Sequence, residues 1–259
     1  MSKIVSIHSF RGGTGKSNTT ANLASLVALA GKRVGIVDTD IQSPGIHVLF
    51  GLDGKKMGHT LNEYLRGECT IEAVAFSVGE NPGDAPGRQK LAGKDIWLIP
   101  SSIDGVEISR ILRDGYDVNQ LNKGMNTIRK SLNLDYLFID THPGLNDETL
   151  LSIAISDVLI LIMRPDQQDF QGTIVTVDVA QSLDVPYLYL VVNKALSKYD
   201  FAQMKTDIEA VYNAPVAGIL PLSEDMVDLA SGDLFALRYP DHPWSQTLRG
   251  VAAKVMQSE

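Results

Sequence analysis

Seven consecutive residues near the start of the chain have the types and spacing of a phosphate-binding loop. They follow an apolar run at residues 4–7 and precede residues 21–30, which are predicted to form a helix. Three glycines leave room for backbone N–H groups to converge on an anion at the positive end of a helix. The loop comprises Gly12, Gly13, Thr14, Gly15, Lys16, Ser17 and Asn18. This segment predicts a site for a ligand that carries phosphate.

Lys16 and Ser17 supply the side-chain chemistry of the loop. In the G-x-x-x-x-G-K-S/T pattern, the lysine reaches the terminal phosphates of a nucleotide and the hydroxyl binds Mg²⁺. Phe10 departs from this pattern, because a small residue normally stands at its position. A glycine turn with an incidental Lys-Ser pair is the alternative, and the predicted strand and helix on either side disfavour it. We therefore expect a nucleotide and Mg²⁺ at this loop.

Three aspartates end apolar segments that are predicted to be buried strands. Asp38 and Asp40 end the segment 33–40, and Asp140 ends the segment 135–140. Parallel strands deliver their carboxyl ends to one ligand crevice, so these carboxylates are expected near the phosphate loop. If the first strand persists to residue 40, Asp38 and Asp40 share one face of it and could act together on Mg²⁺ and a water molecule. The alternative is that both acids cap the next helix.

Residues 11–17, R-G-G-T-G-K-S, resemble the deviant Walker A loop, K-G-G-x-G-K-S/T, of the ParA/MinD ATPases. In that family a signature lysine at the first position reaches across an ATP-sandwiched homodimer to the partner's nucleotide. Arg11 stands at this position here, and its guanidinium has the charge and planar fork to act on phosphate in trans. Arg11 could instead pair with a carboxylate of its own chain. The resemblance implies ATP as the nucleotide.

The same resemblance implies roles for the aspartates. Asp40 matches the residue of the family that positions the attacking water, and Asp38 is expected at or near the metal. Asp140 matches the Walker B carboxylate, which orders Mg²⁺ opposite Ser17. The candidate catalytic residues are therefore Arg11, Lys16 and Asp40, and the candidate metal-site residues are Ser17, Asp38 and Asp140.

Two later residues are similar in position to those that surround the adenine base in the family. Asn193 ends a predicted strand, and its amide offers both a donor and an acceptor to the edge of a base. A simple strand-end turn is the alternative for Asn193. Pro221 opens the loop that closes over the base in these ATPases. His142, in the glycine turn after Asp140, is expected to be a polar loop residue rather than a catalytic one.

Strand-like segments alternate with helical segments along the chain. The strands are predicted at residues 4–7, 33–40, 96–100, 135–140, 158–163, 187–193 and 215–220. This alternation requires right-handed crossovers around a mainly parallel sheet. The sequence therefore predicts a doubly wound α/β fold of the P-loop NTPase type, as one domain over residues 1–259. The Gly- and Pro-rich segment 77–95 is expected to be a surface loop.

The composition excludes several classes of protein. The chain has 259 residues, 44% of them hydrophobic, a formal net charge of −8, and one cysteine, Cys69. One cysteine cannot form a disulfide within the chain, and iron–sulfur carriers on this scaffold need paired cysteines. The first residues lack the pattern of a signal peptide, and no apolar run approaches the roughly 20 residues of a membrane span. We expect a cytoplasmic protein.

The last helical segment has an apolar face that could anchor a protein to a membrane or pack on its core. MinD-type proteins bind membrane through a C-terminal amphipathic helix, which needs several cations beside a bulky apolar face. Only Arg249 and Lys254 flank the face here, so we expect it to pack on the protein's own core. The face comprises Trp244, Leu248, Val251, Ala252 and Val255.

By resemblance, the protein is expected to be a slow ATPase that a partner protein stimulates. Its ATP-bound homodimer is expected to bind a cellular surface and to position or partition a cargo. We expect nucleoid DNA as the surface and an adaptor protein as the activator, with membrane less favoured. Lys123, Arg129 and Lys130 could contact DNA, although a solvated helix face is the commoner explanation. Arg11 and the lack of a membrane helix favour the carboxysome-distributing McdA group. A plasmid or chromosome partition ATPase and a MinD-like division regulator are the alternatives.

Overall fold

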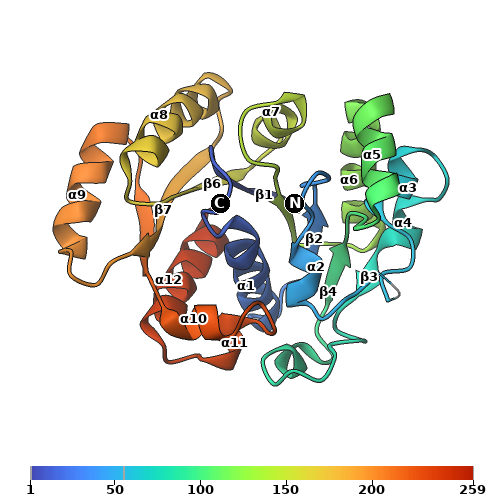
Figure 1. The fold of residues 1–259 in the computed structure, drawn as a ribbon, viewed down its shortest axis with the longest axis horizontal. Helices are drawn as coiled ribbons and strands as arrows, with labels where there is room; N and C mark the ends of the chain where they lie inside the picture. Colours follow the sequence, from blue (N-terminus) through green and yellow to red (C-terminus); the bar gives the residue numbers. More distant parts are fainter. Residues whose placement is uncertain (1, 55, 259) are drawn as a thin grey trace.

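The computed structural model describes residues 2–54 and 56–258, and its centre is an eight-stranded sheet (Figure 1). The strand order is β3-β4-β2-β5-β1-β6-β7-β8, and only the edge strand β3 runs antiparallel to its neighbour. The predicted doubly wound, mainly parallel sheet is therefore confirmed. The strands are β1 Lys3–His8, β2 Val34–Asp38, β3 Phe76–Ser77, β4 Ile96–Ile99, β5 Tyr136–Asp140, β6 Val158–Met163, β7 Tyr187–Ala195 and β8 Val216–Pro221.

Helices cover both faces of this sheet (Figure 1). The layer around the central helix α1 consists of α1 Lys16–Leu29, α2 Ile46–Leu49, the 3₁₀ helix η1 Arg88–Leu91, α10 Glu224–Asp228, α11 Phe235–Arg238 and α12 Pro243–Gln257. The opposite layer consists of α3 Leu61–Leu65, α4 Ile71–Val74, α5 Gly105–Asp114, α6 Val118–Ser131, α7 Asp147–Ala154, α8 Gln167–Ser182 and α9 Phe201–Tyr212.

The central strands are apolar at nearly every position because both of their faces are covered. All residues of β2, β5 and β6 are buried. This is the pattern of a parallel sheet between two helical layers, where no face of a strand meets water. The polar residues of these strands are concentrated at their carboxyl ends, where Asp38 and Asp140 are direct register partners. The sheet thus brings two carboxylates from distant parts of the sequence side by side.

Two predicted boundaries beside the phosphate loop were wrong. Helix α1 begins at Lys16, five residues before the predicted start at residue 21, and its first five residues are polar, so the apolar pattern did not reveal them. Strand β2 ends at Asp38 rather than at residue 40. The backbone N–H of Asp40 donates a 3.0 Å hydrogen bond to Oδ1 of Asp38, which turns the chain out of the sheet.

The segment 77–95 is more ordered than a simple surface loop. It contains η1, and Arg88 at the start of that helix is buried. The N–H groups of Gly87 and Arg88 donate to the carboxylate of Asp233 at 2.7 and 3.0 Å. Because charge-assisted hydrogen bonds are among the stronger ones in proteins, this contact holds the segment against the loop before α11.

The C-terminal helix packs on the core, as predicted. Its five apolar residues are buried, and α12 lies against α1 and β8. Burial of this face leaves no apolar stripe on α12 for a lipid surface. Among the described residues, no helix combines the length and apolar character that a membrane span requires.

Candidate nucleotide site

The predicted phosphate loop connects β1 to α1 and lines a cavity of about 380 Å³. Gly13 and Gly15 have φ values of 77° and 93°, in the left-handed region where residues with a Cβ are strained. A Cβ on Gly15 would also collide with the side-chain amide of Asn193. The lining comprises Ser9, Gly12, Gly13, Thr14, Gly15, Lys16, Ser17, Asn18, Asp40, Ser43 and Pro143. The structure thus brings the whole predicted loop and Asp40 to one cavity.

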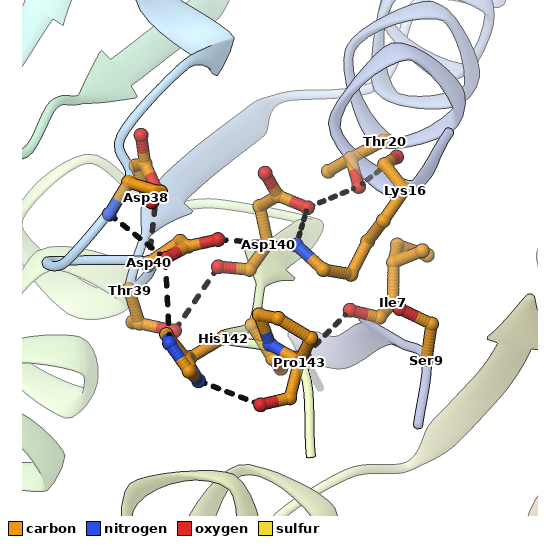
Figure 2. A network of polar contacts seen from close by, with 12 residues as sticks. Ile7, Ser9, Lys16, Thr20, Asp38, Thr39, Asp40, Asp140, His142 and Pro143 are labelled. Atoms are coloured by element: carbon orange, nitrogen blue, oxygen red, sulfur yellow. Dashed lines mark hydrogen bonds and ion pairs between the residues drawn. The ribbon is translucent and has the colours of Figure 1, made fainter. Parts of the chain in front are cut away.

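Lys16 lies between two of the predicted aspartates (Figure 2). Its Nζ is 3.2 Å from Oδ1 of Asp140 and 3.9 Å from Oδ2 of Asp40. The hydroxyl of Thr20, one turn further along α1, lies 3.0 Å from the same Oδ1 of Asp140. Lys16 and Asp140 are both buried, so their attraction is only weakly screened by water. This arrangement fixes the lysine at the base of the cavity.

Asp38 lies deeper than Asp40 and has fewer partners. Burial and the charge of the adjacent Asp140 raise the pKa of Asp38 well above its ordinary value. Its Oδ2 atom is buried, and no hydrogen-bond partner for it exists among the residues that the structure describes. The expectation that Asp38 and Asp40 share one strand face was wrong, because β2 ends at Asp38. Asp40 instead reaches the cavity from the turn that follows the strand.

Asp40 lines the cavity, is only 7% exposed and has mixed electrostatic surroundings. Burial raises its pKa, whereas the nearby Lys16 and His142 lower it. Its Oδ1 accepts a 3.2 Å hydrogen bond from the N–H of Ser43 and lies 3.9 Å from Nε2 of His142. The carboxylate is therefore held in place by the backbone of its own turn and lies between the ammonium of Lys16 and the ring of His142.

Sequence reasoning missed three polar residues around this cluster: His8, Thr20 and Thr141. The buried His8 ring contacts the Thr141 hydroxyl at 2.7 Å through Nδ1, and burial and the charge of Lys16 lower the pKa of His8 to about 3. Thr20 is signalled in the sequence only by its position one turn after Lys16. His8 ends β1, so the alternation of strands and helices could have placed it at the ligand edge of the sheet.

Arg11 lies outside the cavity, against the first turn of α8. Its Nη1 donates a hydrogen bond to Oε1 of Gln168 and is 3.8 Å from Oδ1 of Asp169. Asp169 already accepts hydrogen bonds from the backbone N–H and the guanidinium of Arg164, both at 2.9 Å. The side chain of Arg11 is 40% exposed, so this contact is weak and easily exchanged. In the isolated chain Arg11 thus lies beside a carboxylate of its own chain, which is one of the two interactions predicted for it.

Asn193 and Pro221 lie near each other at the ends of β7 and β8, where Pro221 pairs with Ala195. The amide of Asn193 is buried and donates a 2.8 Å hydrogen bond to the carbonyl oxygen of Thr14. Its Oδ1 accepts from the N–H of Lys194 at 2.9 Å. In this arrangement Asn193 supports the phosphate loop from behind, and Pro221 is half-buried beside it. The predicted contact of both residues with adenine stays a prediction.

The residues of the cavity, together with the buried Asp38 and Asp140 beside it, fit a nucleotide phosphate and Mg²⁺. Two carboxylate oxygens, Oδ2 of Asp38 and Oδ2 of Asp140, are buried without a hydrogen-bond partner among the described residues. Buried carboxylate oxygens are costly unless a cation or a donor completes them. Within residues 2–54 and 56–258, no cluster of three or more His, Cys, Asp or Glu side chains forms a metal cage. Mg²⁺ usually keeps several waters and binds few protein ligands, so the hydroxyl of Ser17 and the unpartnered oxygens of Asp38 and Asp140 would fit it.

Comparisons with known proteins agree with this geometry. A family model described as AAA domain (AAA_31) matches residues 2–184. The "Uncharacterized ATP-binding protein MJ0547" of Methanocaldococcus jannaschii is 27% identical to this chain over 258 residues. That alignment covers 99% of this chain and 88% of the relative.

Solved structures share the fold at lower identity. The septum site-determining protein MinD of Pyrococcus horikoshii OT3, complexed with Mg-ADP, superposes with a TM-score of 0.79 at 19% identity and covers 99% of this chain and 97% of that one. Apo McdA of Cyanthece superposes with a TM-score of 0.75 at 20% identity and covers 98% and 100%. Because the family match spans most of the chain and includes the loop and all three aspartates, the protein belongs to the AAA domain family of ParA/MinD-like, P-loop ATP-binding proteins.

Proposed function

We propose that the chain is an ATP-hydrolysing dimerisation switch that positions or partitions an intracellular cargo. The observation that carries this proposal is the position of Lys16, which lies at the base of the 380 Å³ cavity between Asp140 and Asp40. A cation held there, below loop glycines that admit an anion, supports binding of the terminal phosphates of ATP.

In the proposed reaction the protein supplies position and charge. Lys16 neutralises the terminal phosphates, and Ser17 with Asp140 would hold Mg²⁺, which neutralises charge on the phosphate oxygens when bound. Asp40 orients the attacking water from the cavity wall, and its raised pKa makes it a better proton acceptor than an ordinary aspartate. Few side chains need to take part in bond making, so slow turnover is expected without a partner.

Arg11 is proposed to complete the nucleotide site of a second copy. It lies outside the set of residues that line the cavity of its own chain, and its weak contact with α8 can be exchanged for a phosphate. A homodimer with ATP between the subunits would use this residue, which is otherwise exposed on the surface. ADP, which lacks the terminal phosphate, would not retain the contact.

We propose that the dimer binds nucleoid DNA and that an adaptor protein stimulates its ATP hydrolysis. Lys123 and Lys130 are exposed on α6, whereas Arg129 is engaged with the backbone and hydroxyl of Ser2. The net charge of −8 means that any DNA contact must come from a local cationic patch. The carboxysome is the cargo that we infer from Arg11, and a plasmid or chromosome is the competing cargo.

Sedimentation of the purified chain with Mg-ATP, with Mg-ADP and without nucleotide tests the switch, with phosphate release measured in parallel. Dimer formation in ATP alone, together with slow phosphate release, is the expected result. A chain that stays monomeric in ATP contradicts the switch, and a chain that dimerises without releasing phosphate is a binding protein and not an ATPase.

Binding of the ATP-bound Asp40→Ala dimer to random-sequence duplex DNA across a salt series tests the proposed surface. Binding that weakens steeply as salt rises is expected, because phosphate contacts release counterions. A confirmed dimer that does not bind DNA at low salt would instead point to a protein or lipid surface.

A further inference from the structure

Phe10 occupies the position at which the phosphate-loop pattern has a small residue, and nothing in the proposed reaction uses its ring. Phe10 is 36% exposed and does not line the nucleotide cavity. Its ring instead packs on helix α8 at Gly172. The departure of the sequence from the common pattern therefore has a structural counterpart on another element.

The Phe10 ring fills the space that a side chain on Gly172 would need. A Cβ built on Gly172 would collide with Cδ1 and Cγ of Phe10 and would lie 2.7 Å from Cε1. Contacts of that length do not occur in folded proteins, so residue 172 has room only for glycine while the ring is present. A helix is less stable with glycine than with alanine at an interior position. The space that the Phe10 ring needs therefore explains why residue 172 is glycine.

Arg11 follows Phe10 directly and contacts the same helix one turn earlier. Its guanidinium bonds to Gln168 and lies 3.8 Å from Asp169. Asp169 is already held by Arg164, so the pair adds little to hold Arg11 in place. Because this pair is long and Arg11 is 40% exposed, it contributes little by itself. The ring of Phe10 is the stronger of the two contacts between the loop and α8.

We infer that Phe10 and Gly172 are positioning residues for Arg11. The ring, seated on α8, fixes the first half of the phosphate loop so that the guanidinium stands outside the cavity of its own chain. There it is ready to reach the nucleotide of a second copy. This inference rests on the proposed function, because it needs a dimer in which Arg11 acts in trans. It explains why an aromatic residue stands at position 10 and why α8 has a glycine at position 172.

Gly172→Ala is the first test, with Gly250→Ala as its matched control. Gly250 is also a helix glycine, but no atom lies within 4 Å of the Cβ that it would gain. Gly172→Ala is expected to lower kcat for ATP hydrolysis by about 10²-fold, the cost of a catalytic group misplaced by about 1 Å. The dissociation constant for ATP is expected to stay unchanged, since the cavity is not touched. Gly250→Ala should retain both values.

Phe10→Gly keeps the test valid if Gly172→Ala fails to fold, because it removes the ring without adding an atom. It should lower kcat as Gly172→Ala does, and Phe10→Tyr, which keeps the ring, should restore it. In the Phe10→Gly background, Gly172→Ala should cause no further loss. The sign of its effect on the melting temperature should also reverse, from a decrease to an increase, since alanine then improves the helix without a collision.

Arg11→Ala separates a positioning role from general damage to the fold. If Phe10 and Gly172 act through Arg11, then Gly172→Ala has no further effect on kcat or on ATP-dependent dimerisation once Arg11 is gone. An additional loss in that background, or normal kcat in Gly172→Ala alone, overturns the inference while leaving the proposed function intact. Failure of the wild-type chain to dimerise in Mg-ATP would remove the proposed function and this inference together.

Discussion

The two halves of the segment 10–17, which leads into and includes most of the phosphate loop, are held by different forces. The second half, from Gly15 into α1, is attached to the centre of the sheet through Lys16, which is buried beside Asp140. The first half, Phe10 and Arg11, rests on the surface of α8 through one ring contact and an exposed ion pair. Two buried side chains hold one half, whereas the other half is held by Phe10 and Arg11, which are 36% and 40% exposed.

Under the proposed function, this difference separates the part of the site that must not move from the part that must exchange its contacts for those of a second subunit. A phosphate-binding lysine works best when its position is fixed before the ligand arrives. A residue that acts on a second subunit must leave its contacts in the isolated chain, so weak contacts favour it. The contrast predicts that changes in the buried half abolish binding, whereas changes in the exposed half reduce turnover and leave binding unaffected.

The largest effect is expected for Lys16→Ala, in the buried half. Loss of the charged contacts to phosphate should reduce ATP binding to an undetectable level and should therefore abolish turnover as well. Titration with a fluorescent ATP analogue measures this, and Lys123→Ala, an exposed lysine far from the loop, is the control. Normal affinity in Lys16→Ala would refute the phosphate assignment.

Arg11→Ala tests the exposed half. If Arg11 acts in trans, the variant should bind ATP normally and lose about 10³-fold in turnover at protein concentrations that support the dimer. Arg11→Lys restores the residue type of the family's signature position and is expected to recover most of the activity. Unchanged dimerisation and turnover in Arg11→Ala would show that the contact with Gln168 and Asp169 is its only role.

Asp40→Ala belongs to neither half, because Asp40 lines the cavity from the turn that follows β2. Loss of the residue that orients water should lower the rate of phosphate release by about 10²-fold, with ATP binding retained. The variant should therefore accumulate as a dimer in Mg-ATP, seen by sedimentation. Hydrolysis at the wild-type rate would assign the orientation of water to another group, and His142 is the nearest candidate.

The smallest effect concerns stability rather than activity. Burial keeps His8 neutral in the folded chain, with its pKa lowered to about 3, whereas the unfolded chain binds a proton near pH 6.5. The unfolded state therefore binds more protons between these values, and the histidine lowers stability by about 1 kcal/mol for each unit that the pH falls below 6.5. Urea unfolding of wild type and His8→Asn at pH 7 and pH 5 isolates this difference. A parallel loss of stability in both proteins would mean that His8 titrates normally in the folded state.

Most of the strands and helices, though not the short β3 and η1, could be predicted from the sequence because each element carries its own signal. Buried parallel strands have continuous apolar runs, as at residues 135–140 and 158–163, and the glycines of the phosphate loop are specific for a backbone that approaches an anion. Asp140 could be assigned for the same reason, since a carboxylate after such a strand lies at the ligand edge of the sheet.

The relation between Asp38 and Asp40 could not be predicted in this way. The spacing D-x-D suits two residues on one strand face, but a hydrogen bond from the N–H of Asp40 to Asp38 ends the strand first. Hydrogen bonds from nearby backbone N–H groups to an aspartate side chain compete with the backbone hydrogen bonds of the sheet. Which of the two forms depends on burial, which cannot be read from the sequence. The buried partners of the cluster, His8 and Thr20, were missed because neither belongs to a contiguous motif.

The sequence by itself determined the fold class, the phosphate loop and the three carboxylates, because periodicity, glycine spacing and strand-end acids are local properties of the chain. Only the tertiary structure decided which residues meet: Asp38 beside Asp140, Asn193 behind Thr14, and Phe10 on Gly172. These pairs are separated by 102, 179 and 162 positions in the sequence. Contacts at such separations depend on strand order and helix packing, which arise only when the whole sheet has formed.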